Sequence, residues 1–136
     1  MLAKISLAEV KHIAELANAV RDARDELLRI KREDLGEPPP ARGEHDPTVA
    51  LGLEPLPADH PGVVALTEAI TALSDEAVHE LRAVFWIGRG EHAAGEWHKA
   101  LAAAAAQTRD VAIGVLVDEA DLHHFLMKGL YELKLA

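Results

Sequence analysis

The two tryptophans of the chain lie on either side of a short charged turn, and this segment has residue types that could bind a ligand. Trp86 comes just before Gly88-Arg89-Gly90, Glu91 follows the turn, and Trp97 lies further on. An arginine guanidinium is always charged and donates forked hydrogen bonds, so it could hold a carboxylate, a phosphate or a partner protein between two aromatic rings. The candidate binding residues are therefore Trp86, Arg89, Glu91 and Trp97.

The same residues also have a structural interpretation. Arg89 could pair with Glu91 or Glu96, or stack on Trp86, and so fix the angle between two helices while both indoles fill the core. We favour this interpretation, because the turn lies between two segments with core-forming apolar residues. The sequence leaves open whether Arg89 is structural or functional.

Pairs of acidic residues and histidine raise the question of a metal. Glu9-x-x-His12 and Glu76-x-x-His79 have the spacing that places two ligands on one helix face in di-iron bundles, and Asp121-x-x-His124 approaches it. However, a chain with 8 histidines and this many glutamates contains roughly one such pair by chance. A metal-binding helical protein is therefore the least favoured of three hypotheses, and we predict no metal ligands and no cofactor.

No recognisable catalytic pattern accompanies these features. The chain has no cysteine, and no serine motif joins His92 or His98 beside the turn to form a nucleophilic set. Gly88-Arg89-Gly90 also lacks the length and the preceding strand of a phosphate-binding loop. We therefore predict a non-catalytic protein without catalytic residues.

Composition and charge exclude further classes of function. Of 136 residues, 49% are hydrophobic and 27% are charged, which is typical of a soluble domain with a hydrophobic core. The net charge of −9 disfavours binding to the negatively charged phosphates of nucleic acid. Basic residues between Arg21 and Arg32 are better explained by the dipole of a helix C-terminus. No apolar stretch approaches the ~20 residues that span a bilayer, and the N-terminus does not resemble a signal peptide. We expect a cytoplasmic protein that binds neither membrane nor nucleic acid.

A proline-rich connector divides the chain. All 7 prolines lie between Pro38 and Pro61, which predicts an extended acidic connector over residues 34–62. We expect residues 1–33 before it to form one long amphipathic helix, and residues 63–136 after it to form a helical core domain.

The first helix presents one apolar stripe. A capping box of Ser6 and Glu9 begins it, and Arg24 interrupts the stripe. The stripe recurs at steps of three and four residues and comprises Val10, Ile13, Ala17, Val20 and Leu27. It must pack within the chain or on a second copy as a short coiled coil, and the sequence does not choose. Our leading hypothesis is a small interaction or regulatory module that forms a homodimer through this helix.

Residues after the connector predict a compact bundle of about four short helices. Ser74 offers a cap for the second of them, and Gly88 or Gly90 ends it. The apolar run Val111–Val117 fits a buried strand or a buried helical turn, and we favour the helix because no partner strand is visible. The predicted fold class is all-α. The other helical segments run over residues 62–73, 96–107 and 122–133.

The part of the chain after the connector contains the following set of residues: Glu80-Leu81, Ala83, Trp86-Ile87-Gly88-Arg89-Gly90, Trp97, Ala100, Val115-Leu116-Val117, Leu122, Phe125-Leu126 and Gly129-Leu130. Together they resemble a bacterial family, the domain of unknown function 3775. The resemblance covers roughly residues 63–133 and implies a helical bacterial domain without an established activity, substrate or catalytic residue. Glu91 stands where the family usually has aspartate, and Ala120 where it usually has proline.

Overall fold

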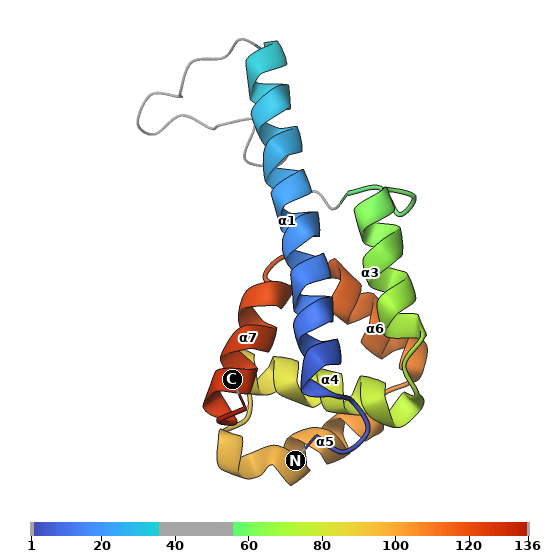
Figure 1. The fold of residues 1–136 in the computed structure, drawn as a ribbon, viewed down its shortest axis with the longest axis vertical. Helices are drawn as coiled ribbons and strands as arrows, with labels where there is room; N and C mark the ends of the chain where they lie inside the picture. The colour runs from blue at the N-terminus through green and yellow to red at the C-terminus, as the bar shows by residue number, and fades with distance from the viewer. Residues whose placement is uncertain (1, 36–55, 136) are drawn as a thin grey trace.

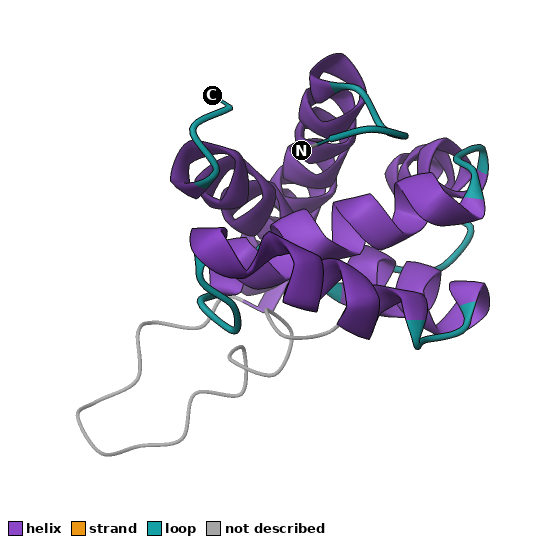
Figure 2. Cartoon of the chain, turned by 90° about the horizontal axis from the view of Figure 1, so that it is seen from below, coloured by secondary structure: helices purple, strands orange, loops and turns teal. Residues whose placement is uncertain are grey.

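Helices form all the regular structure in the described part of the chain. The computed structural model describes residues 2–35 and 56–135, and no strand occurs within these two ranges (Figures 1 and 2). The all-α prediction is confirmed, and the number of short α-helices is close to the predicted four. Residues 36–55, most of the predicted connector, lie outside the described residues. The elements are α1 (Leu7–Leu35), α3 (Pro61–Thr71), α4 (Asp75–Arg89), the 3-10 helix η1 (Ala94–Glu96), α5 (Trp97–Ala105), α6 (Arg109–Asp118) and α7 (Leu122–Glu132).

Local sequence signals set the helix starts. The Ser6 hydroxyl accepts a hydrogen bond from the Glu9 N–H at 3.0 Å, and the Glu9 carboxylate accepts one from the Ser6 N–H at 3.0 Å. This is the predicted capping box of α1. At α4 the Ser74 hydroxyl accepts from the Ala77 N–H at 3.2 Å. Both caps satisfy N–H groups that the first turn of a helix leaves without an intrahelical partner.

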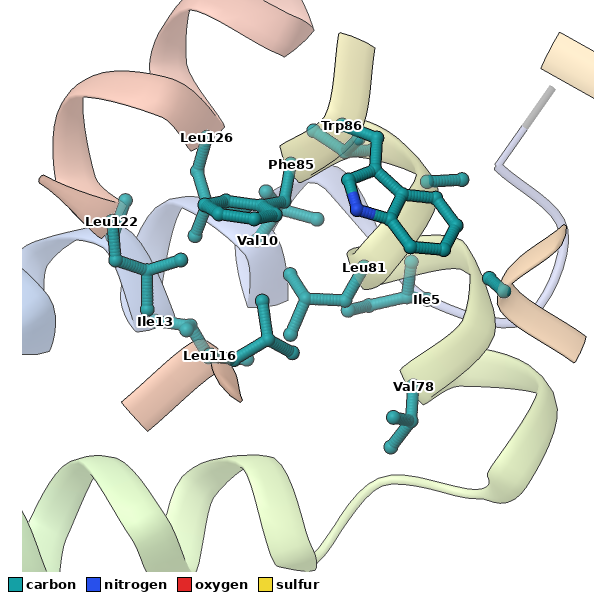
Figure 3. Close-up of a cluster of buried hydrophobic side chains, with 14 of the residues drawn as sticks. Ile5, Val10, Ile13, Val78, Leu81, Phe85, Trp86, Leu116, Leu122 and Leu126 are labelled. Carbon is teal, nitrogen blue, oxygen red and sulfur yellow. The ribbon is translucent and has the colours of Figure 1, made fainter. Parts of the chain in front are cut away.

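The helix α4 is the centre of the fold. From Ala77 to Gly88, every residue except His79 is buried. It contacts α5, α6 and α7, so all three helices that follow it in the chain pack against it. Figure 3 shows Phe85 and Leu81 of α4 facing apolar side chains from three other helices. These are Val10 and Ile13 of α1, Leu116 of α6, and Leu122 and Leu126 of α7.

The first half of α1 belongs to the same core. Val10, Ile13, Ala14 and Ala17 are buried, and α1 contacts α7 and α3. This part of the apolar stripe therefore packs within its own chain. The C-terminal part of α1 projects from the rest of the molecule (Figure 1).

A buried carboxylate fastens the segment before α1 to α4. The Glu80 side chain is 3% exposed and accepts hydrogen bonds from the backbone N–H groups of Ala3, Lys4 and Ile5 at 2.8–3.2 Å. Successive N–H groups of this kind form an anion-binding concavity, and hydrogen bonds to a charged acceptor are stronger than neutral ones. The contact also places Ile5 in the core.

The helices α4 and α7 cross so closely that the contact requires two glycines. A Cβ atom on Gly88 would lie 1.8 Å from the carbonyl oxygen of Phe125, and one on Gly129 would lie 2.2 Å from that of Val84. Neither distance is compatible with a side chain, so the two backbones touch only because both positions lack one. The crossing brings the Phe125 ring edge-on to Phe85, with the centroids 5.8 Å apart.

We predict that Gly129→Ala lowers the free energy of unfolding by at least about 2 kcal/mol, because the added methyl group forces α4 and α7 apart. Urea denaturation followed by circular dichroism measures the change. Gly114→Ala in α6 is the matched control, since no heavy atom lies within 4 Å of its added Cβ. The control is expected to stabilise the protein by about 0.5–1 kcal/mol through helix propensity. Equal stability of wild type and Gly129→Ala would contradict the close crossing.

We also predict that Glu80→Gln loosens the start of the chain. The amide keeps the shape of the carboxylate but presents an NH₂ group to backbone donors, so about 1–3 kcal/mol of stability is lost. Hydrogen exchange at Ala3, Lys4 and Ile5 should become faster. Glu76→Gln, at an exposed position of the same helix, should leave these amides as they are. Unchanged exchange in Glu80→Gln would count against the anchoring role.

Candidate functional site

The tryptophan turn is the end of α4. Gly90 has a φ of 86°, in the left-handed region that glycine adopts without strain. Its N–H donates to the Ile87 carbonyl at 3.1 Å, and the Glu91 N–H donates to the Trp86 carbonyl at 3.0 Å. This pair of hydrogen bonds is a Schellman motif. Of the two predicted helix ends, Gly90 is therefore the one used, and Gly88 instead serves the contact with α7.

Both tryptophans lie in the core. Trp86 near the end of α4 and Trp97 at the start of α5 are buried. The Trp86 ring lies 5.8 Å from the His92 ring, at a tilted angle. The two indoles thus fill space between helices, as the structural interpretation of the turn expects.

Arg89 is held by residues of its own chain. Its Nε lies 3.4 Å from a carboxylate oxygen of Glu91, and its Nη1 lies 4.0 Å from one of Glu119. The guanidinium carbon also lies 5.4 Å from the centre of the Phe85 ring and 6.0 Å from that of Phe125. Arg89 therefore connects the end of α4 with α7 and with the segment before it. This is the geometry of a clamp at a helix corner.

Two of the expected contacts of Arg89 are made by other residues. The guanidinium that lies over the Trp86 ring is that of Arg82, with its carbon 4.7 Å from the ring centre, whereas Arg89 lies near the rings of Phe85 and Phe125. Glu96 pairs with Lys99 at 3.3 Å and accepts a hydrogen bond from its own segment, so it is not a partner of Arg89. The expected pair with Glu91 is present.

Arg82 is the least ordinary residue of the site, and sequence reasoning missed it. It is 5% exposed, and its Nε and Nη1 have no hydrogen-bond partner in the described part of the chain. Two aromatic rings cover it, since the centre of the Phe85 ring also lies 5.3 Å from the guanidinium carbon. Nothing in the local pattern of α4 distinguishes this arginine from a solvent-facing one.

Three charged groups at or beyond the end of α4, Arg89, Glu91 and Glu119, influence a fourth, Arg82, which lies in the middle of the helix. The pKa of Arg82 is lowered from its usual value, mainly because the group is buried and also because Arg89 is positively charged. The negative charges of Glu91 and Glu119 oppose this shift. A guanidinium nevertheless stays charged throughout the range of pH in which proteins fold. Within the described residues, the half-exposed Arg89 makes the ion pairs with both glutamates, and the buried Arg82 makes none.

The Glu/His pairs that raised the question of a metal do not join a larger group of potential ligands in the described residues. Among residues 2–35 and 56–135, no three side chains of histidine, aspartate or glutamate lie close enough to hold a metal ion. Some histidines have structural partners instead. The Nδ1 atom of His60 accepts from the Gly62 N–H at 3.1 Å and caps α3, and that of His123 lies 2.9 Å from the Ala14 carbonyl.

The projecting half of α1 is a second candidate surface. Val20 is half-buried at the edge of the body, whereas Leu27 and Ile30 further along are 38% and 41% exposed. Leu27 continues the stripe that is buried in the first half of the helix, and Ile30 lies one turn beyond it. The described part of the chain thus leaves this end of the stripe open.

The region after the connector matches a known protein family. The model of a family described as "Protein of unknown function (DUF3775)" matches residues 63–135. The chain belongs to this family. No curated protein and no solved structure matches this chain. The DUF3775 match begins within α3 and includes the whole tryptophan turn, but Ala3, Lys4 and Ile5, which bind Glu80, lie outside it.

The apolar helices of the DUF3775 region are short. Among the described residues, no single helix has the length and apolar character needed to cross a membrane. Among these residues, the segments Ala94–Ala105 and Arg109–Asp118 have that length and apolar character only when they are taken together, and the chain bends by 115° between them.

We predict that Arg89→Met lowers the free energy of unfolding by about 1 kcal/mol. The substitution keeps an apolar stem but removes two half-exposed ion pairs and the contacts of the guanidinium with two rings. Urea denaturation at low and high salt measures this loss, which should shrink as salt screens the charges. Lys99→Met, which removes only an exposed pair with Glu96, is the control and should change little. Wild-type stability in Arg89→Met would remove the clamp role.

Proposed function

We propose that this chain is a non-catalytic helical interaction module that forms a homodimer through the projecting half of α1. The observation that carries the proposal is the change along one face of that helix. Val10 and Ile13 are buried in the body, whereas Leu27 and Ile30 are exposed. Large apolar side chains at helical spacing, continuing a buried stripe, favour a surface that a partner covers.

Charge favours a second copy as that partner. Residues 20–30 contain three arginines and three acidic residues, so this segment is neutral in a chain with a net charge of −9. Two such segments can approach without the repulsion that the rest of the chain would add. A two-fold axis then uses the same apolar face on both subunits.

The two other hypotheses have less support. A small anionic ligand held by Arg89 between Trp86 and Trp97 has less support, because the rings near the Arg89 guanidinium are those of Phe85 and Phe125. A metal-binding function would need ligands that the described helices do not bring together. Cytoplasmic location and the absence of catalysis stay parts of the proposal.

The dimer can be tested with substitutions outside the core. We predict that wild type elutes with the mass of a dimer in size-exclusion chromatography with light scattering. Leu27→Glu combined with Ile30→Glu should give a monomer with a nearly unchanged Tm, because both side chains lie outside the body. Tyr131→Glu, at an exposed position of α7, is the control and should stay dimeric. A monomeric wild type, or a dimeric double variant, would contradict the proposal.

Deletion of residues 1–33 is a poor substitute for these point variants. It would remove Ile5, Val10 and Ile13 from the core together with the projecting face. Loss of the dimer would then be inseparable from loss of the fold.

A further inference from the structure

Arg82 is a buried charge that its surroundings satisfy only in part. Removing a charged group from water is unfavourable unless the group is paired and hydrogen-bonded. The rings of Trp86 and Phe85 offset part of this penalty through cation–π contacts at 4.7 and 5.3 Å. A ring beneath the guanidinium cannot accept the N–H bonds that point outward in its plane. Nε and Nη1 therefore still need acceptors.

Three charged side chains that water partly reaches lie near this arginine. The side chains of Arg89, Glu91 and Glu119 are 39%, 44% and 22% exposed, and all three lie near enough to shift the pKa of Arg82. Their ion pairs, at 3.4 and 4.0 Å, join groups that water still reaches, so each contributes little to stability. An incoming anion can take the place of Glu91 on Arg89 and reach Arg82 as these side chains turn outward.

The charges of the cluster indicate which anion fits. Two arginines and two glutamates make it neutral before anything binds. A carboxylate adds a single negative charge, whereas a phosphate adds up to two beside the glutamates of a chain with a net charge of −9. Carboxylates also form strong charge-assisted hydrogen bonds with guanidinium groups. The rings of Phe85, Trp86 and Phe125 next to the two arginines suit an apolar or aromatic group attached to that carboxylate.

We infer that Arg82 and Arg89 form a binding site for a monoanionic carboxylate carried on an apolar or aromatic group. Arg82 supplies the buried donors, and Arg89 exchanges Glu91 for the ligand. The site extends along α4 from Arg82 in its middle to Arg89 at its end, and it is independent of the pairing of α1.

Sodium benzoate is a suitable probe, and benzamide is its uncharged counterpart of nearly the same shape. Both are titrated at constant ionic strength while tryptophan fluorescence is recorded in a Trp97→Phe background, so that the signal comes from Trp86 alone. Benzoate should give a saturable change, and benzamide and inorganic phosphate should bind at least about tenfold more weakly. No saturation with benzoate, or equal binding of benzamide or phosphate, would overturn the inference.

Substitution of the buried arginine locates the site. Arg82→Gln should weaken benzoate binding at least about tenfold, because it removes the charge that the carboxylate meets. Arg109→Gln is the control, since this arginine pairs with Asp75 at 3.0 Å, and its affinity should equal that of wild type. If circular dichroism shows that Arg82→Gln does not fold, Arg89→Gln decides, with an expected weakening of about threefold or more. Wild-type affinity in the folded variant would show that benzoate binds elsewhere and would sink the proposal.

Discussion

The backbone contact between α4 and α7 is the constraint on which the rest of the structure depends. Gly88 and Gly129 allow these helices to touch, and no side chain could stand at either position. Because the helices meet there, Phe125 reaches Phe85 and Arg89. The same approach brings Glu119, just before α7, to Arg89. The tryptophan turn is thus a consequence of helix packing, and its arginine is positioned by a crossing that two glycines make possible.

A second constraint ties the chain's beginning to the family region. Glu80 lies inside the part that matches DUF3775, and it binds backbone groups of residues 3–5, outside that part. The core likewise includes Ile5, Val10 and Ile13 together with side chains of α4 and α7. The amino-acid composition divides the chain at the proline-rich segment, but the hydrophobic core contains residues from both sides of that segment.

Sequence reasoning succeeded where the physical cause is local. Ser6 with Glu9, Ser74, and Gly90 mark helix ends through hydrogen bonds to residues within five positions, so their types and spacing are sufficient. It failed where the cause is a distant neighbour. Gly88 was considered as a helix end, although it faces Phe125, 37 positions along the chain. A helical pattern predicts that α4 has a buried face, but not what meets that face.

Glu80 and Arg82 show the same limit more sharply, and the contrast between them explains why we place a binding site at one and not the other. Both are charged, both are buried in α4, and they lie two positions apart, so they point to different sides of the helix. Glu80 meets three backbone N–H groups and is satisfied by its own chain. Arg82 meets aromatic rings, while the nearest carboxylates contact Arg89. A buried carboxylate with three donors is an anchor, because moving it away would leave those donors without an acceptor. A buried guanidinium with donors to spare can gain hydrogen bonds when an anion arrives, and this difference is what allows it to recognise a ligand.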